Sequence, residues 1–184
     1  IVFQLTALFS LDSFGGGFAV DSLVALWLYQ RFGLPVAALG SVFFVARTLS
    51  AFSQLASPRL AARFGLIETM VFTHIPANLF LILAALMPNA TLAVTFLLLR
   101  MALSSMDVPA RQSYVMSVVP PEERAGAASV TNVPRSFASA LAPLLAGALL
   151  KASTFGWPLI AAGSLKIAYD LLLLRQFRHV RPQE

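Results

Sequence analysis

The chain has 184 residues, of which 58% are hydrophobic and 11% are charged. Soluble domains are on average about 45–50% apolar and about 25% charged, so this composition excludes an ordinary water-soluble globule. A chain of this size cannot hide so much apolar surface in one core, and hydrocarbon is the solvent that fits. The net charge of +5 is spread along the chain, which argues against a nucleic-acid partner, and the lack of cysteine excludes disulfides and thiolate metal sites.

Six apolar runs are long enough to be membrane helices, which need about 20 mostly apolar residues to cross a bilayer. These runs predict an all-α polytopic transmembrane bundle of six spans, at about 1–29, 35–56, 67–87, 90–106, 126–150 and 155–174. Residues 1–174 then form one six-helix domain, and residues 175–184 form a basic cytoplasmic tail. The chain begins inside an apolar run without the features of a signal peptide, so we expect a fragment of a longer protein.

The basic residues predict which ends of the spans face the cytoplasm, because cytoplasmic loops carry the excess of Lys and Arg. Only Arg31 and Lys151 belong to the loops of one side. The loops and tail of the other side hold Arg59, Arg63, Arg111, Arg124, Arg175, Arg178 and Arg181. Both termini are therefore expected in the cytoplasm. Trp27, Tyr29 and Trp157 lie near the predicted outer ends, where aromatic rings anchor at headgroup depth.

Several ionisable residues lie deep inside the predicted spans, where each charge costs roughly 3 kcal/mol and is a functional hypothesis by default. They are Asp12, Asp21, Arg47, Arg100, Arg135 and Lys166. The excess of cations in this set leaves two interpretations open. The charges lock helices together as buried ion pairs, or they line a water-filled cavity.

The first span contains a glycine triplet, Gly15-Gly16-Gly17, between Asp12 and Asp21. Nine residues rotate two positions of a straight helix to opposite faces, so these carboxylates share a face only if the helix breaks between them. The triplet can unwind and serve as a gate, or it can be a close-packing contact for a neighbouring helix. On the sixth span, Lys166 and Asp170 are four residues apart and are expected to pair along one helix face.

Two predicted inner loops carry recognisable motifs. The segment from Pro58 to Leu66 resembles the loop after the second helix of each half in the major facilitator superfamily, with the pattern Gly-x-Leu-Ala-Asp-Arg-x-Gly-Arg-Lys. The matching residues are Leu60, Ala61, Arg63 and Gly65, whereas Pro58 and Ala62 depart from the pattern.

The second motif segment, from Asp107 to Ala125, looks like the inner loop after the fourth helix of such a half. An Arg-x-x-Tyr, here Arg111 to Tyr114, and a Pro-Glu-Glu-Arg that includes Glu123 and Arg124 recur there in many bacterial members. Asp107 and Arg111 have the spacing of an i,i+4 ion pair. The resemblance covers essentially the whole chain as one six-helix half. The cytoplasmic C terminus favours the C-terminal half, whose N-terminal partner half is then missing.

The resemblance implies a secondary transporter in the inner membrane of a bacterium, which alternates access around a midplane site between two halves. By this analogy the first, second, fourth and fifth spans line the cavity, and the third and sixth pack outside. The side chains expected along the substrate and ion pathway are Asp12, Asp21, Arg47, Arg100 and Arg135. A cation there can hold an anionic substrate, and Asp12 or Asp21 is the expected proton carrier.

Other function classes fit less well. An intramembrane serine protease needs a Ser–His dyad, and His74 and His179, the two histidines of the chain, suggest none. No zinc, phosphate-loop or dinucleotide motif occurs, so we expect neither an enzyme nor a cofactor. A membrane scaffold or receptor remains as the alternative, and it predicts that the midplane charges are fully paired and dry. An anionic substrate and proton-coupled drug export both stay open, as do the direction of transport and the coupling ion.

Overall fold

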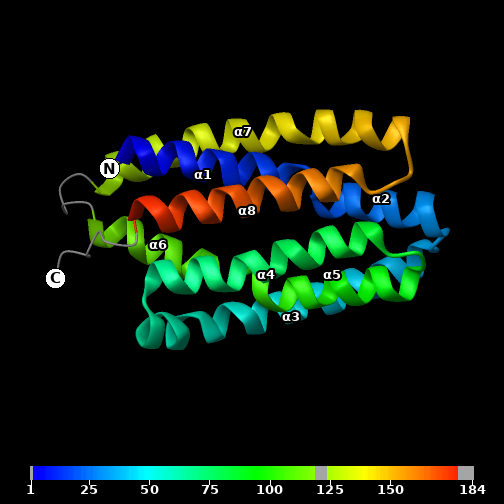
Figure 1. Cartoon of the computed structure of the whole chain (residues 1–184), viewed down its shortest axis with the longest axis horizontal. Coiled ribbons are helices and arrows are strands. Elements are labelled where there is room, and N and C mark those ends of the chain that lie inside the picture. Colours follow the sequence, from blue (N-terminus) through cyan, green and yellow to red (C-terminus); the bar gives the residue numbers. More distant parts are fainter. Residues whose placement is uncertain (1, 119–123, 178–184) are drawn as a thin grey trace.

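The computed structural model describes residues 2–118 and 124–177, and within these ranges the chain is a bundle of helices without strands (Figure 1). The helices are α1 (Val2–Gly17), α2 (Asp21–Phe32), α3 (Val36–Phe64), α4 (Leu66–Leu86), α5 (Ala90–Ser104), α6 (Asp107–Val118), α7 (Arg124–Ala152) and α8 (Trp157–Phe177).

Six spans in the described part are long and apolar enough to cross a membrane, which confirms the expected all-α six-span bundle. Two of the spans are composite, because α1 and α2 together form the span Phe3–Phe32, and α5 with most of α6 forms the span Ala90–Tyr114. Figure 1 shows the N-terminal helix, the end of α8, the α3–α4 connection and α6 at one end of the bundle. The α4–α5 and α7–α8 connections lie at the opposite end.

The helices extend beyond two of the predicted boundaries. The second span was expected to end at residue 56, but α3 continues through the motif segment to Phe64. The segment after Met106, expected to be a loop, is helical as far as Val118. Pro109 lies in the first turn of α6, where its missing N–H leaves no hydrogen bond unmade. Polar residues at a membrane surface therefore ended the hydrophobic run without ending the helix.

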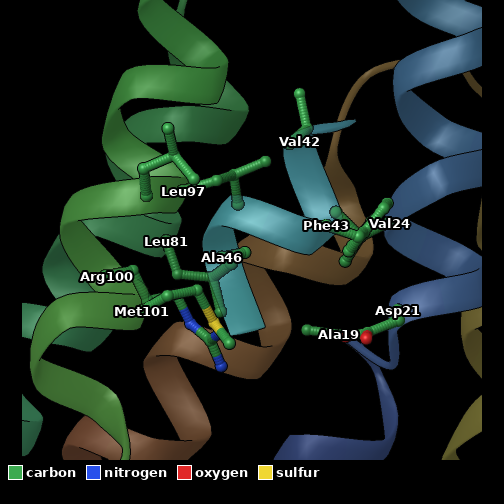
Figure 2. A pocket seen from close by; sticks show the side chains of 11 residues that line it. Ala19, Asp21, Val24, Val42, Phe43, Ala46, Leu81, Leu97, Arg100 and Met101 are labelled. Atoms are coloured by element: carbon green, nitrogen blue, oxygen red, sulfur yellow. The ribbon is translucent and has the colours of Figure 1, made fainter. Parts of the chain in front are cut away.

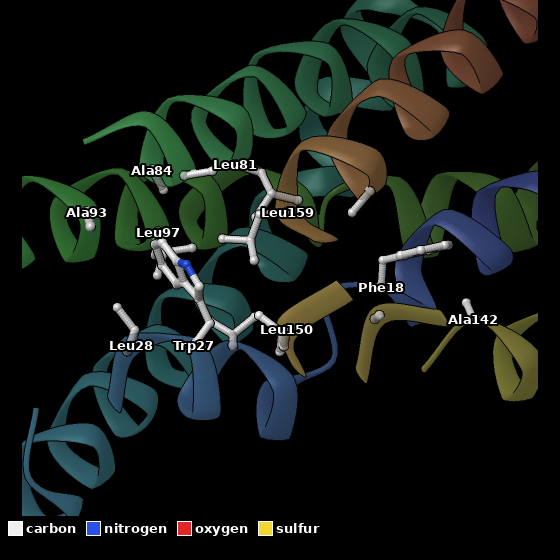
Figure 3. Packing of buried hydrophobic residues seen from close by; sticks show 14 of the residues in the cluster. Phe18, Trp27, Leu28, Leu81, Ala84, Ala93, Leu97, Ala142, Leu150 and Leu159 are labelled. Atoms are coloured by element: carbon white, nitrogen blue, oxygen red, sulfur yellow. The ribbon is translucent and has the colours of Figure 1, made fainter. Parts of the chain in front are cut away.

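One large apolar cluster occupies the half of the bundle where α4 and α5 connect, and Trp27 lies in it with Leu81, Leu97 and Leu159 (Figure 3). The expectation that Trp27 anchors in the headgroup layer is wrong, because its side chain is fully buried. Arg31, one turn further along α2, donates hydrogen bonds to the carbonyl oxygens of Ala85 at 2.9 Å and Met87 at 3.1 Å. These contacts attach α2 to the end of α4. Tyr29 and Trp157 are exposed, as a headgroup anchor requires.

A second apolar cluster lies at the end of the bundle that holds the termini. Its largest members are Phe9, Met70, Tyr114, Tyr169 and Phe177, from α1, α4, α6 and α8. The buried polar residues described below lie between helices of this half. α4 and α8, which the resemblance places outside the cavity, are the most enclosed spans of the described part of the chain.

Candidate functional site: a charged interior

The glycine triplet lies where α1 crosses two neighbouring helices. A Cβ atom on Gly15 would meet Cγ of Lys166 at 3.1 Å, and one on Gly17 would meet Cβ of Ala142 at 2.6 Å and the Ser139 carbonyl oxygen at 2.7 Å. α1 ends at Gly17, and α2 begins at Asp21. The triplet is therefore a packing contact with α7 and α8, and the helix is interrupted directly after it.

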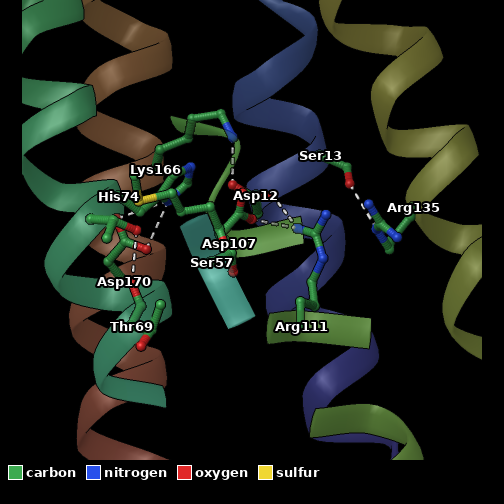
Figure 4. Close-up of polar contacts among 12 residues, drawn as sticks. Asp12, Ser13, Ser57, Thr69, His74, Asp107, Arg111, Arg135, Lys166 and Asp170 are labelled. Atoms are coloured by element: carbon green, nitrogen blue, oxygen red, sulfur yellow. Dashed lines mark hydrogen bonds and ion pairs between the residues drawn. The ribbon is translucent and has the colours of Figure 1, made fainter. Parts of the chain in front are cut away.

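Asp12 is the centre of a buried ion cluster that joins three helices (Figure 4). One carboxylate oxygen accepts a hydrogen bond from Lys166 Nζ of α8 at 2.5 Å, and the other accepts from Arg111 Nη1 of α6 at 3.1 Å. Arg111 also pairs with Asp107 at 3.2 Å, as their spacing predicts. We call Asp12, Asp107, Arg111 and Lys166 the inner cluster. All of its side chains are buried.

The pairing of Lys166 differs from the sequence prediction. Its ammonium group contacts Asp12, and the expected partner, Asp170, contacts other residues. The reason is packing, because the Lys166 stem lies over Gly15 and Gly16 and directs the ammonium group toward α1.

Asp170 forms a separate buried site with two residues of α4. His74 Nδ1 donates to its carboxylate oxygens at 2.9 Å and 3.1 Å, and Asn78 Nδ2 donates to one of them at 3.4 Å. The sequence analysis considered His74 only as a protease residue and missed this pairing. A histidine and an asparagine one turn apart in an otherwise apolar span were the available signal.

Nearer the other end of the bundle, Asp21 pairs with Arg47 and so connects α2 to α3. Both side chains are partly exposed, by 45% for Asp21 and 64% for Arg47. This pair is therefore more accessible than the inner cluster.

Arg100 lies on α5 beside a small cavity of about 30 Å³ that Asp21 also lines (Figure 2). Its Nη1 donates to Met101 Sδ at 3.2 Å, a weak acceptor, and its buried Nε has no hydrogen-bond partner. Within the part of the chain that the structure describes, no carboxylate lies at ion-pair distance from Arg100. We call Asp21, Arg47 and Arg100 the outer cluster.

Arg135 of α7 lines an open hollow of about 450 Å³ with several small polar side chains. Its Nε donates to Ser13 Oγ at 3.0 Å, and its Nη1 donates to Asn132 Oδ1 at 3.3 Å. Ser136 and Ser139 belong to the same hollow. Arg135 thus has neutral partners, and one side of α7 is polar.

The structure separates the predicted pathway residues. Asp12 belongs to the inner cluster, whereas Asp21, Arg47 and Arg100 form the outer cluster. Of the motif residues, Asp107 and Arg111 belong to the inner cluster, whereas Arg63 and Gly65 lie outside both clusters. The Arg63 guanidinium lies over the Phe64 ring, 5.3 Å from its centre, and Gly65 ends α3 with a φ of 100°.

Two motif positions remain, Glu123 and Arg124. Glu123 lies outside the described residues, and Arg124 is the first residue of α7.

Six apolar helices that enclose paired charges define an integral membrane protein. The chain matches the sequence profile of the Major Facilitator Superfamily over residues 6–184, and it belongs to this family. Members of this family are membrane transporters. The resemblance seen in the two motif segments is thereby confirmed at the level of the family.

The chain is also similar to an uncharacterized membrane protein of Saccharomyces cerevisiae, YJR124C, with 29% identity over 178 residues. The match covers 96% of this chain and 40% of the yeast protein. The chain therefore spans about 40% of the length of this relative.

Proposed function

We propose that this chain is one six-helix half of a secondary active transporter that moves a small anionic solute by alternating access, coupled to protons. The observation that carries the proposal is Arg100, a cation inside a membrane span. Its Nε has no hydrogen-bond partner among the residues that the structure describes, and its Nη1 donates to the thioether of Met101. A charged group at this depth costs roughly 3 kcal/mol on insertion scales. A carboxylate or phosphate of the solute would supply the missing partner.

The outer cluster suits a binding site that opens and closes. The cavity beside Arg100 has a volume of about 30 Å³, which accommodates water but not a solute. Asp21 and Arg47 form its neighbouring ion pair and connect α2 to α3. A solute therefore reaches Arg100 only after α2 or α3 moves, which is what alternating access supplies.

The polar side of α7 supports a second half as partner. Asn132, Arg135, Ser136 and Ser139 lie together around the open hollow. Polar side chains within a span face protein or water and avoid lipid. We infer that this side faces an N-terminal six-helix half across the translocation path, as the greater length of the yeast relative suggests.

Orientation and location follow from the charge distribution and the motifs. We propose that the termini face the cytoplasm, because the basic residues gather in the loops of that side. The likeness of the Pro-Glu-Glu-Arg segment to bacterial members favours a bacterial inner membrane. A reporter fused after residue 184 should be active only in its cytoplasmic form.

The alternative function, a membrane scaffold or receptor, predicts that the midplane charges are fully paired and dry. The inner cluster fits that description. Arg100 and the open hollow beside Arg135 do not. Transport is therefore the function that these observations favour.

The test is uptake by the complete protein in proteoliposomes, with and without an imposed pH gradient. The panel contains small carboxylates, phosphate esters and amphipathic cations. We expect accumulation of an anion that depends on the gradient, and loss of transport in Arg100→Gln. The matched control is Arg175→Gln, which removes an exposed arginine at the end of α8 and should transport normally.

Each outcome bears on one part of the proposal. Normal transport by Arg100→Gln would remove this residue from the site. Accumulation that ignores the pH gradient would refute proton coupling, and transport of cations alone would refute the anionic substrate.

A further inference from the structure

The buried site formed by His74, Asn78 and Asp170 has no role in the proposed solute path. It lies between α4 and α8, away from the outer cluster, and the exposed fraction is 3% for His74 and 0% for Asp170. The two helices approach closely beside it, because a Cβ atom on Gly163 would lie 2.8 Å from the Asn78 carbonyl oxygen. A titratable pair enclosed this tightly requires an explanation.

Asp170 differs from the other buried carboxylates in the charge of its partners. Asp12 contacts Lys166 and Arg111, and Asp107 contacts Arg111. Asp170 contacts an imidazole and a neutral amide, and no Lys or Arg of the described residues lies within ion-pair distance of it. Lysine and arginine keep their protons near neutral pH, whereas histidine gains and loses one. The partner of Asp170 is therefore the one whose charge can change.

The geometry suits one shared proton. With the proton present, the His74 Nδ1–H group donates to both carboxylate oxygens, at 2.9 Å and 3.1 Å. When the proton leaves to water, a neutral imidazole faces a charged and fully buried carboxylate. A carboxylate that loses its counter-charge in such a place is strongly destabilised, unless another cation reaches it.

Lys166 is the cation that can reach it. It lies one turn before Asp170 on α8, at the i,i+4 spacing that permits a pair along the helix. In the structure its ammonium group contacts Asp12 of α1. α1 does not crowd the end of the Lys166 side chain, because even a Cβ atom on Gly16 would lie at ordinary contact distances, 3.5 Å from Cε and 3.7 Å from Nζ. Two carboxylates therefore compete for one flexible ammonium group.

We propose that His74 and Asp170 form a proton-binding site, and that its occupancy decides whether Lys166 pairs with Asp12 or with Asp170. In the proton-bound state His74 neutralises Asp170, and Lys166 joins α8 to α1, which is the pairing of Lys166 that the structure shows. Loss of the proton transfers Lys166 to Asp170 and breaks this connection. Asp12 then keeps Arg111 as its partner, so α1 stays joined to α6.

The groups around the proton site set its response to pH. Asp12 of α1 acts on the Asp170 carboxylate from a neighbouring helix, and Lys166 and Tyr169 act on it from α8 itself. Arg111 and Asp107 of α6 act on Tyr169. The Tyr169 ring packs edge-on against the His74 ring, with centres 6.2 Å apart. The inference rests on the proposed function, because the His74–Asp170 site would bind the proton that drives transport. The experiment that tests the site does not require a transport assay.

The test is a pH titration of the complete protein in lipid nanodiscs, followed by infrared difference spectroscopy between about pH 5 and about pH 9. Isotope-labelled histidine identifies the imidazole bands. The signals of the site are those that His74→Gln removes, which separates them from those of His179. We expect a carboxyl and an imidazole signal of this kind that titrate together, and we expect both to be lost in Asp170→Asn. The matched control is Asp21→Asn, which removes a carboxylate paired with arginine and should leave both signals unchanged.

Two further variants test the exchange of Lys166. Lys166→Gln removes the cation that stabilises the deprotonated site, so the titration midpoint should rise by about one pH unit. Asp12→Asn frees Lys166 to stay with Asp170, so the midpoint should fall by a similar amount. Equal midpoints in the wild type and both variants would refute the exchange of Lys166.

Failure of the proton site is distinguishable from failure of the proposed function. If the folded wild type shows no imidazole titration that His74→Gln removes, or if that signal persists in Asp170→Asn, the proton site is refuted even when transport is normal. If Asp170→Asn does not fold, the comparison of the labelled wild type with His74→Gln decides. The wild type must then show one titrating imidazole signal that His74→Gln lacks, together with a carboxyl signal of the same midpoint.

Discussion

The inner and outer clusters place charges inside the same membrane spans in two different ways. In the inner cluster every ionic side chain is buried and each one has an opposite charge within 3.2 Å. In the outer cluster the Asp21–Arg47 pair is partly exposed, and Arg100 has no carboxylate partner in the described part of the chain. Complete pairing holds helices together, whereas incomplete pairing leaves a cation available to a solute.

The largest expected effect on stability comes from opening the inner cluster. Arg111→Gln leaves Asp107 without a cation and leaves Asp12 with Lys166 alone. Removal of one partner from a buried ion pair costs about 3–5 kcal/mol, so the yield of folded protein and the unfolding temperature should both fall sharply. Thermal unfolding in detergent, monitored by size-exclusion chromatography, is the measurement. An unfolding temperature equal to that of the wild type would show that the inner cluster is not a structural lock.

An intermediate effect is expected at the crossing of α1 and α7. Gly17→Ala places a Cβ atom 2.6 Å from Ala142 Cβ, and overpacking of this kind costs about 1–3 kcal/mol. The control is Gly147→Ala, since a Cβ atom there meets nothing within 4 Å. An alanine inside a helix is favoured over glycine, so the control should match or exceed the wild type in unfolding temperature. Equal losses in the two variants would contradict the packing role of Gly17.

The smallest effect on stability is expected in the outer cluster. Arg47→Gln breaks a pair that is about half exposed, and such pairs contribute roughly 0–1 kcal/mol. The unfolding temperature should therefore stay near that of the wild type, while transport changes because α2 loses its ion pair to α3. A loss of stability as large as that of Arg111→Gln would remove the distinction between the two clusters.

Much of the architecture was predictable because membrane insertion depends on local composition. The six spans, the motif segments and the charged positions could be read from runs of about 20 residues. The helical segment from Asp107 to Val118 was missed, because a polar stretch can continue a helix at the membrane surface or line the protein interior. Trp27 was also misplaced. Its position near the end of a span predicts its depth in the membrane, but it does not predict whether its side of the helix faces lipid or packs against other helices.

The sequence predicted which charged residues lie inside the spans, but it did not predict which of them form ion pairs with each other. Asp12, Arg100 and Lys166 were recognisable because charge inside an apolar span is costly wherever it points. The choice of Asp12 over Asp170 as the partner of Lys166 depends on a contact between residues 154 positions apart. The same is true of His74 and Asp170, which are separated by 96 positions.

The sequence by itself determined that this protein lies in lipid, how often it crosses the membrane and which costly charges it carries there. Each of these properties depends on the transfer of short segments from water to hydrocarbon. Tertiary structure alone decided which charges neutralise each other and which cation is left over. That choice depends on how closely helices approach, and at Gly15, Gly17 and Gly163 the absence of a side chain sets the approach.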